Sequence, residues 1–405
     1  MPINDIIYIH YIYGGIIMSL INNSVNWVEV DLDAILYNLN GLRKKLPSQT
    51  KVCMVVKSNA YGHGSAKLAK FYEENGVDFL AVARAREAFE IRKAGVTIPI
   101  LNLGYTNLPT VEDCIKNNVS MTIFDYEYAK KINDIAKKIN RTAKIHLKMD
   151  TGMSRLGYVV LEEDIDHIVL EIEKISKLEY IEIEGMYTHF ATADARNKEF
   201  EELQTGRFAK MVEALENKGL RPPYVHSSNS AEILDMEEKY DMVRMGIVQY
   251  GLYPSDEVSR SVDLKPAMSF KAKVSNIKIL NPGTSISYGR IYFTTVKERI
   301  ATITVGYADG FLRGRRNPYV FINGIKCPIV GRICMDQCMV RVPMDMDIKI
   351  DDDVLIFGSE HVTVDDIAHD CDTINYEVLC QVSRRVPRVY IQDGKIVDIV
   401  DYLLD

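Results

Sequence analysis

The chain has 405 residues, 47% of them hydrophobic, which is enough to bury a sizeable core and favours two domains. Its 49 basic and 56 acidic residues give a net charge of −7, and no basic tract occurs, so nucleic acid is not expected as a partner. The seven scattered cysteines lack the paired spacing of a zinc site, which predicts free thiols in a cytoplasmic protein and no metal centre.

The N-terminal stretch is apolar and aromatic from Ile6 onward, but it lacks the features of a targeting segment. No basic residue precedes it, no small-residue cleavage site is evident, and it is too short to span a membrane. We therefore expect residues 1–17 to be an extension without fold significance, with Met18 as a candidate start, and we expect no membrane partner.

From Asp33 onward, short apolar runs alternate with helical patterns. Eight such runs over roughly 200 residues fit an α/β fold of the (β/α)₈ barrel type, which we place at residues 18–262. A doubly wound sheet is the alternative, but no Gly-x-Gly-x-x-Gly follows the first run. The predicted strands are Lys51–Val56, Phe79–Val82, Ile98–Leu101, Ser120–Phe124, Ala143–Met149, Ile181–Tyr187, Tyr224–His226 and Met242–Arg244, and the predicted helices include Ser65–Asn75, Arg84–Ala94, Asp125–Asn140 and Asn197–Lys218.

The pattern changes near Asp263, where apolar and polar residues begin to alternate with a period of two, as in Met268–Leu280. Asn323-Gly324 suits a type I′ turn between two strands, and Gln392-Asp393-Gly394 marks a second hairpin. A short helix is predicted at Thr373–Ser383. Residues 263–405 are therefore predicted to form a mostly-β domain.

Lys57 is the first candidate for chemistry, because the apolar run that precedes it ends abruptly there. The loop Ser58–Gly64 that follows is rich in glycine and small polar residues. A lysine at the carboxyl end of a buried strand is partly desolvated, which makes its amine a nucleophile able to form a Schiff base. The alternative is a solvated lysine that caps the strand.

Functional residues of barrel enzymes gather at the carboxyl ends of the strands. Here those ends carry mostly cationic and small polar residues, which suit an anionic ligand such as a phosphate. A lysine beside a phosphate site predicts pyridoxal 5′-phosphate. The residues at these ends are Tyr61, Lys148, Arg155, His189, His226, Asn229, Ser230, Arg244, Gly246 and Ile247.

Seven motifs in order extend this picture. They are Val56–Gly64, Asp150–Gly157, Gly185–Phe190, Arg244–Ile247 with Tyr250–Leu252, Ser287–Gly289, Val305–Gly310 and Gly331–Gln337. With these motifs the chain resembles the alanine racemase family, the barrel-type (fold type III) pyridoxal-phosphate enzymes of bacterial cell-wall synthesis, from about Trp27 to about Tyr390.

The resemblance implies a two-base racemisation, in which Lys57 holds the cofactor and acts as one base. Tyr288 is the other base, on the opposite face of the Schiff base, and it needs nearby positive charge to act so. Arg244 faces the ring nitrogen of the cofactor, where it can only donate a hydrogen bond. A surface aromatic for Tyr288 and an ion pair for Arg244 are the structural alternatives.

The remaining roles that the resemblance implies concern binding. Phosphate contacts come from Tyr61, Ser230 and the backbone of Gly246 and Ile247. His189 packs on the cofactor ring and His226 orients Arg244, with core histidines as the alternative. Arg155 binds the phenolic oxygen of the cofactor and the substrate carboxylate, and Lys148, as a carbamate or an unmodified ion-pairing lysine, supports it. Met335 and Asp336 lie near the substrate carboxylate, and Tyr307 narrows access to the site.

In this family Tyr288, Tyr307 and Met335 enter the site from the β domain of the partner subunit, which implies a head-to-tail homodimer. One departure is Arg384, which stands where many members have a tyrosine that contacts the phosphate. Arg384 could bind the phosphate or turn to solvent and widen the pocket. The predicted activity is interconversion of L- and D-alanine, supplying D-alanine for peptidoglycan. The alternatives are a serine or broader-specificity racemase, an amino-acid decarboxylase on the same fold, and a non-catalytic cofactor-binding barrel.

Overall fold

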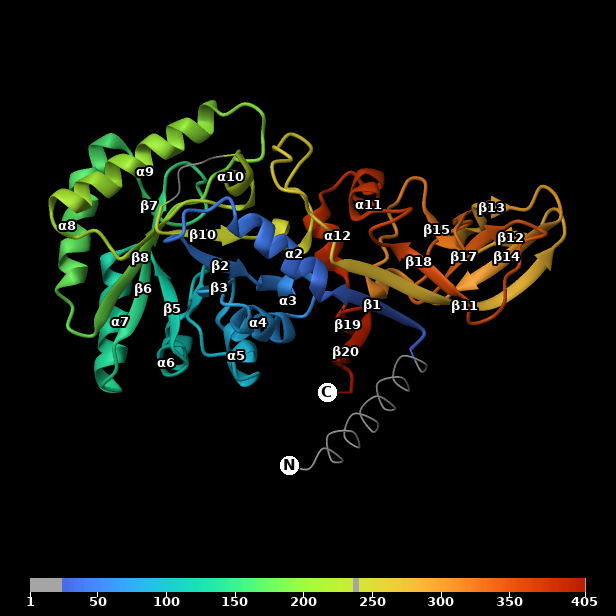
Figure 1. Cartoon of the computed structure of the whole chain (residues 1–405), viewed down its shortest axis with the longest axis horizontal. Coiled ribbons are helices and arrows are strands. Elements are labelled where there is room, and N and C mark those ends of the chain that lie inside the picture. Colours follow the sequence, from blue (N-terminus) through green and yellow to red (C-terminus); the bar gives the residue numbers. More distant parts are fainter. Residues whose placement is uncertain (1–23, 236–239, 405) are drawn as a thin grey trace. The chain divides into compact units, whose positions relative to one another are not determined.

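The computed structural model describes residues 24–235 and 240–404, so the prediction about residues 1–17 lies outside the described part. The described chain divides into two compact units (Figure 1). One unit consists of residues 38–264, and the other combines the segment that ends at Tyr37 with the segment that begins at Lys265.

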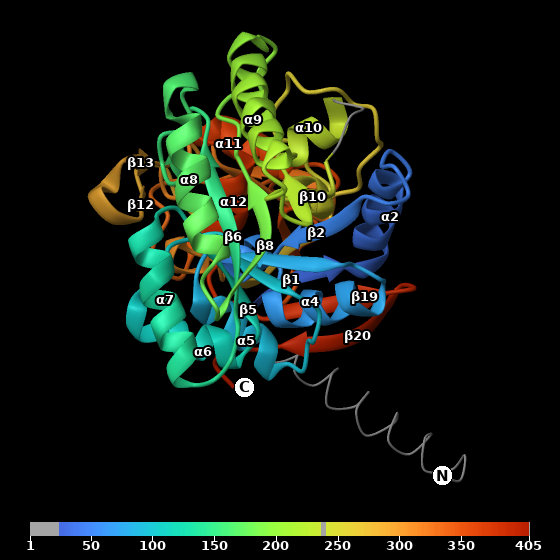
Figure 2. The same ribbon diagram turned by 90° about the vertical axis from the view of Figure 1, so that its left-hand side faces the viewer.

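The unit of residues 38–264 is the predicted barrel, with helices around its strands (Figure 2). Among its described residues, eight parallel strands pair in the order β10-β2-β3-β4-β5-β6-β8-β9. At the closure, two backbone hydrogen bonds of 3.0 Å join β9 and β10 with the residues that flank them, from the N of Asp241 to the O of Val225 and from the N of Arg244 to the O of Ser228. The strands are β2 (Lys51–Val55), β3 (Phe79–Val82), β4 (Ile100–Asn102), β5 (Val119–Ile123), β6 (Ala143–Asp150), β8 (Ile181–Tyr187), β9 (Tyr224–His226) and β10 (Met242–Met245), with β7 (Tyr158–Val159) beside β6.

Helix α7 illustrates how an outer helix of the barrel buries an apolar stripe. In α7 (Tyr126–Lys138) the buried residues include Tyr128, Ile132 and Ala136, spaced by four, and the Asp125 carboxylate caps the helix by accepting from the backbone N of Tyr128 at 2.7 Å. No helix among the described residues is long and apolar enough to cross a membrane. The other helices are α3 (Lys57–Tyr61), α4 (Ser65–Glu74), α5 (Ala85–Lys93), α6 (Leu108–Lys116), α8 (Ile165–Ser176), α9 (Glu199–Asn217) and α10 (Ser230–Asp235).

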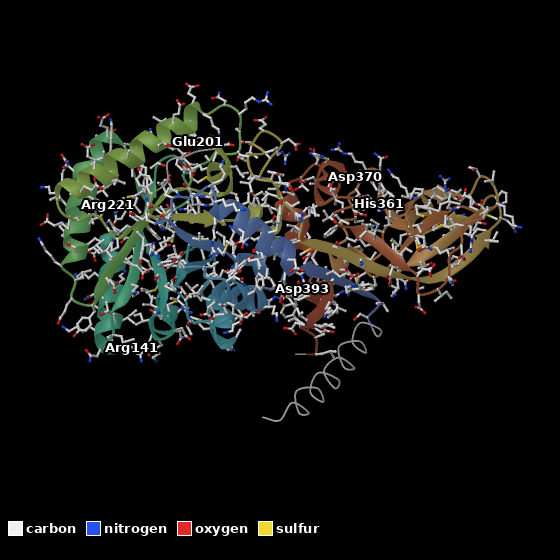
Figure 3. All side chains as sticks on the ribbon, viewed as in Figure 1. Arg141, Glu201, Arg221, His361, Asp370 and Asp393 are labelled. Atoms are coloured by element: carbon white, nitrogen blue, oxygen red, sulfur yellow. The ribbon has the colours of Figure 1, made fainter. Side chains whose placement is uncertain are left out.

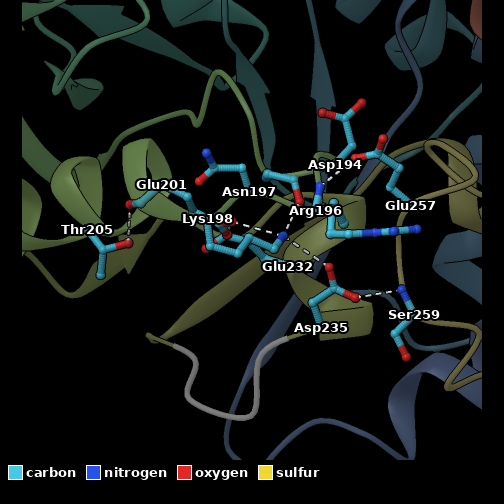
Figure 4. Close-up of polar contacts among 12 residues, drawn as sticks. Asp194, Arg196, Asn197, Lys198, Glu201, Thr205, Glu232, Asp235, Glu257 and Ser259 are labelled. Atoms are coloured by element: carbon cyan, nitrogen blue, oxygen red, sulfur yellow. Dashed lines mark hydrogen bonds and ion pairs between the residues drawn. The ribbon is translucent and has the colours of Figure 1, made fainter.

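Ion pairs tie together loops on the outside of the barrel unit. Arg221, labelled in Figure 3, lies 2.7 Å from Asp241. Lys198 lies 2.9 Å from Glu201 and 3.1 Å from Asp235, so it joins the start of α9 to the end of α10 (Figure 4).

The structure differs from the predicted domain boundary at the N-terminal side. Sequence analysis assigned residues 18–262 to the barrel, but β1 (Asn26–Asp31) belongs to the other unit. The reason is pairing, because β1 lies between β11 (Met268–Leu280), to which it is antiparallel, and β19 (Arg388–Gln392), to which it is parallel. Helix α2 (Leu32–Arg43) runs across the division at Tyr37.

The second unit is mostly β, as predicted. Its main sheet has the order β16-β15-β18-β11-β1-β19-β20, and β14 connects β11 to β17. Asn323-Gly324 and Asp393-Gly394 have positive φ at both residues, as type I′ turns require. The remaining elements are β12 (Ser285–Ile286), β13 (Tyr292–Phe293), β14 (Glu298–Ile303), β15 (Tyr319–Ile322), β16 (Ile325–Pro328), β17 (Cys338–Val342), β18 (Asp353–Phe357), β20 (Lys395–Val400), α11 (Val364–Cys371) and α12 (Asn375–Gln381).

Candidate functional site

Lys57 follows the buried strand β2 and begins an unusual turn. The next four residues, Ser58–Tyr61, all have left-handed backbone angles, with φ between 51° and 56°. An L-residue in this region costs about 1–2 kcal/mol, and such strain is found at functional sites. The Glu87 carboxylate accepts from the backbone N of Ser58 at 2.6 Å and helps to hold the turn.

Tyr61, Ser230 and Gly246 form a small polar cradle. The backbone N of Gly246 donates to Ser230 Oγ at 3.0 Å. A Cβ at Gly246 would lie 3.1 Å from Ser230 Oγ and 3.4 Å from the Tyr61 hydroxyl. The absence of a side chain at 246 therefore leaves room between two hydroxyls and a backbone amide, which is the donor set that a phosphate needs.

Arg244 is a buried cation held by several acceptors. Its Nη1 lies 2.8 Å from Nδ1 of His226, and its Nη2 donates to the carbonyls of Ser227 at 2.7 Å and Thr188 at 2.9 Å. Nη2 also lies 3.3 Å from Nδ1 of His189. The structure thus brings Arg244 together with both predicted histidines.

The environment of His189 is strongly cationic. Burial and the charges of Arg244, Arg155, Lys148 and Lys57 hold the pKa of His189 well below its usual value, so the imidazole is neutral. These five residues come from four different strand ends, and the structure places them within electrostatic reach of one another. An anionic ligand would neutralise this concentration of positive charge.

Lys148 is nearly buried, and its Nζ donates to the backbone O of Met149 at 2.6 Å. Burial, together with the charge of Arg244, lowers its pKa to about 7. A large fraction of this amine is therefore neutral, and therefore nucleophilic, near neutral pH. Arg155 is exposed and lines an open pocket of about 400 Å³ together with Asp150 and Arg207.

In the β unit, Tyr288 and Tyr307 are exposed aromatic residues. Tyr288 has 68% of its surface accessible and lies in a short 3₁₀ turn, next to Gly289, against which the Arg332 guanidinium packs. Tyr307 is 43% exposed, and its backbone N donates to the carbonyl of Cys334 at 3.1 Å. Arg332 supplies positive charge near the turn that carries Tyr288.

An arginine clamp fixes the loop of Asp336. Arg385 donates from Nε to Asp309 at 2.7 Å and from Nη2 to Asp336 at 2.6 Å. A Cβ at Gly306 would lie 2.2 Å from the carbonyl O of Met335, so only glycine lets these two loops pack so closely. The loops of Tyr307, Met335 and Asp336 therefore form one assembly inside this unit.

Arg384 is exposed, and its guanidinium lies over the ring of Tyr402, 4.8 Å from the ring centroid. Its contact with a phosphate stays a prediction.

Sequence reasoning missed two residues inside the barrel: His146, whose Nδ1 lies 3.0 Å from Nε2 of His226, and Glu184, whose Oε2 lies 3.2 Å from Nε2 of His146. In the β unit it missed the roles of Arg332 beside the Tyr288 turn and of Arg385 in the clamp. For His146 the sequence contained a signal, because Lys144, His146 and Lys148 occupy every second position of β6 and therefore share one side of the strand. No comparable signal exists for Arg385, whose two partners are distant in the sequence.

Comparison with known proteins gives consistent matches over both units. Residues 30–254 match the family model described as alanine racemase, N-terminal domain, and residues 267–390 match alanine racemase, C-terminal domain. "Alanine racemase 2" of Caldanaerobacter subterraneus subsp. tengcongensis is 46% identical over 93% of this chain and 97% of its own length. The solved alanine racemase of Clostridium difficile 630 is 48% identical with a TM-score of 0.91, covering 94% of this chain and 99% of that one. The alanine racemase of Bacillus anthracis with bound L-Ala-P is 37% identical with a TM-score of 0.88, covering 94% of this chain and 98% of that one.

Proposed function

The chain belongs to the alanine racemase family and is a racemase, and from that premise we propose that it interconverts L-alanine and D-alanine with pyridoxal 5′-phosphate as cofactor. The observation that carries the proposal is the joint occurrence of Lys57 at a strand end, the cradle of Tyr61, Ser230 and Gly246, and the buried Arg244.

The barrel residues fit this cofactor. Lys57 would hold it through its amine, while Tyr61, Ser230 and the backbone of Gly246 and Ile247 would hold the phosphate. When bound, the cofactor withdraws electrons from the α-carbon of an amino acid and so makes its C–H bond acidic. Arg244 can only donate hydrogen bonds, so it would keep the ring nitrogen that it faces unprotonated. The neutral His189 would pack on the ring without adding charge.

Racemisation needs a proton acceptor on one side of the α-carbon and a donor on the other. We assign these roles to Nζ of Lys57 and the hydroxyl oxygen of Tyr288. The exposure of Tyr288 supports a role at a surface that another subunit completes. We therefore propose a head-to-tail homodimer, in which Tyr288, Tyr307 and Met335 complete the partner's site.

Substrate recognition falls to a cation and to the clamped loop. Arg155 would bind the substrate carboxylate, and Met335 and Asp336 would line the same region, with Tyr307 limiting access. The lowered pKa of Lys148, about 7, favours reaction of its neutral amine with carbon dioxide. We propose that the resulting carbamate neutralises part of the local positive charge and orients Arg155.

The cellular role that we propose is supply of D-alanine for peptidoglycan in the cytoplasm. The seven cysteines are free thiols, the state that a reducing compartment maintains. Because Arg384 packs on Tyr402, we expect a pocket wider than one narrowed by tyrosine at that position, and turnover of serine beside alanine.

A chiral assay of the purified protein with cofactor, run on alanine, serine and other small amino acids, tests the activity. We expect racemisation of alanine in both directions, and no D/L interconversion of any of them would contradict the proposal. Lys57→Ala should abolish the absorbance of the lysine-bound cofactor, and a normal spectrum would refute the role of Lys57.

Shared sites can be tested by mixing two inactive chains. Lys57→Ala and Tyr288→Phe chains, co-expressed, should regain about one quarter of the wild-type activity, because half of randomly mixed dimers have one intact site of two. Each chain alone is the control. No recovery in mixed dimers, shown to form by differential tagging, would contradict the arrangement.

A further inference from the structure

A line of side-chain hydrogen bonds runs through the barrel interior from Arg244 to Glu184. Nη1 of Arg244 lies 2.8 Å from Nδ1 of His226, whose Nε2 lies 3.0 Å from Nδ1 of His146. Nε2 of His146 lies 3.2 Å from Oε2 of Glu184. The four side chains come from the strands β10, β9, β6 and β8, and none of these residues is more than 4% exposed. We call this line the histidine relay.

The chemistry of the two ends sets the direction of every hydrogen bond in the histidine relay. A guanidinium has no acceptor, so Nδ1 of His226 must accept and its proton must be on Nε2. That proton is donated to Nδ1 of His146, which leaves the proton of His146 on Nε2, directed at Glu184. An ionised carboxylate accepts only, so the two ends agree on one pair of tautomers.

The Glu184 end is built to stay ionised. Lys144 donates to Oε1 at 2.8 Å, and the hydroxyl of Ser120 donates to Oε2 at 2.5 Å. Burial would raise the pKa of Glu184, but the hydrogen bonds from His146, Lys144 and Ser120 lower it to about 2. With these three donors around it, the carboxylate is charged near neutral pH.

The position of the His146 ring depends on Gly185. A Cβ at Gly185 would lie 2.4 Å from both Cε1 and Nδ1 of His146, so the ring packs directly on the strand backbone. His226 is held in turn by stacking on Tyr187, with ring centroids 4.9 Å apart and planes 6° from parallel. Packing fixes where the two rings lie, and Arg244 and Glu184 at the two ends together determine which ring nitrogens carry protons.

We propose that Glu184 is a positioning residue for Arg244, acting through His146 and His226. This inference rests on the proposed function for the place of Arg244 in the site. With a glutamine at 184, the amide could donate instead of accept, and the relay could reverse. Reversal puts a proton on Nδ1 of His226, facing an N–H of Arg244, and breaks the contact that holds the guanidinium.

The tautomers can be measured without catalysis, by ¹⁵N NMR of the histidine rings in the wild-type holoenzyme and in the cofactor-free chain. We expect His226 and His146 each to carry their proton on Nε2. A proton on Nδ1 of His226, or a doubly protonated ring in the pair, would overturn the proposal. Because this measurement needs no turnover, a wild-type protein that does not racemise alanine would refute the proposed function and leave the relay to be judged separately.

The variant Glu184→Gln tests the consequence. We expect a mixture of His226 tautomers and a kcat about tenfold lower, with KM for the amino acid within about twofold of wild type. The matched control is Glu201→Gln, which neutralises another nearly buried glutamate of the barrel unit that pairs with a lysine and has no part in the relay. Wild-type tautomers or a wild-type kcat in Glu184→Gln would overturn the proposal, and if that variant does not fold, the wild-type spectrum decides.

Discussion

Replacing Gly246 by alanine should weaken binding of the cofactor, and the loss of affinity should come only from contacts with the phosphate. The new methyl carbon would lie 3.1 Å from Ser230 Oγ and 3.4 Å from the Tyr61 hydroxyl, in the space that the proposed phosphate needs. Losing one hydrogen bond to a charged group costs about 1.5–3 kcal/mol, which corresponds to roughly 10- to 100-fold in Kd. Since about 1.4 kcal/mol corresponds to a factor of ten in Kd, we expect Gly246→Ala to bind pyridoxal phosphate roughly 10- to 100-fold more weakly than the wild type.

The assay is titration of the cofactor-free protein with pyridoxal phosphate and, in parallel, with pyridoxal, which lacks the phosphate. Wild type should prefer the phosphorylated form, and Gly246→Ala should lose most of that preference. The matched control is Gly206→Ala, because a Cβ at Gly206 meets no atom within 4 Å. Equal affinity of wild type and Gly246→Ala for pyridoxal phosphate would refute the cradle as the phosphate site.

Three further variants test strain, burial and the clamp. Ser58→Gly should raise the free energy of unfolding by about 1 kcal/mol, because glycine tolerates the φ of 53° at this position. The control is Ser259→Gly, at an exposed serine without positive φ, which should lower the free energy of unfolding. Urea unfolding measures both variants, and a lower free energy of unfolding in Ser58→Gly would contradict the strained turn. Burial lowers the pKa of Lys148 to about 7, so between about pH 7 and 10 the unfolded chain binds a proton that the folded chain does not. In carbon-dioxide-free buffer, the free energy of unfolding of the wild type should therefore rise with pH, relative to Lys148→Met, by up to about 1.4 kcal/mol per pH unit. Parallel pH profiles of the two proteins would disprove the lowered pKa. Arg385→Met should cost about 2 kcal/mol of stability and raise KM, since it frees the Asp336 loop, and unfolding and kinetics equal to wild type would argue against the clamp.

The strands, the hairpins and most predicted helices followed from local patterns in the sequence. The predicted turn at Asn323-Gly324 is observed directly after the strand Tyr319–Ile322, because turn chemistry acts over a few residues. The predicted end of β4 was less accurate, since Ile98–Leu101 was expected and Ile100–Asn102 is observed. The buried Asn102 continues the strand because its position is decided by pairing with β3 and β5.

The assignment of β1 to the β unit was not predictable from its own residues. Asn26–Asp31 reads as a short strand in either domain, and only pairing with β11 and β19, more than two hundred residues away, decides where it belongs. Likewise, none of the four residues of the left-handed turn Ser58–Tyr61 is a glycine, so their composition did not indicate positive φ angles.

By itself, the sequence determined the two architectures, the lysine that ends the first barrel strand and the motifs that carry the family likeness. The tertiary structure alone decided which polar groups share one buried network, as in the line from Arg244 through His226 and His146 to Glu184. The physical reason is that periodicity reports burial along one element, whereas the direction of a hydrogen bond and the charge of a carboxylate depend on partners that other strands bring close.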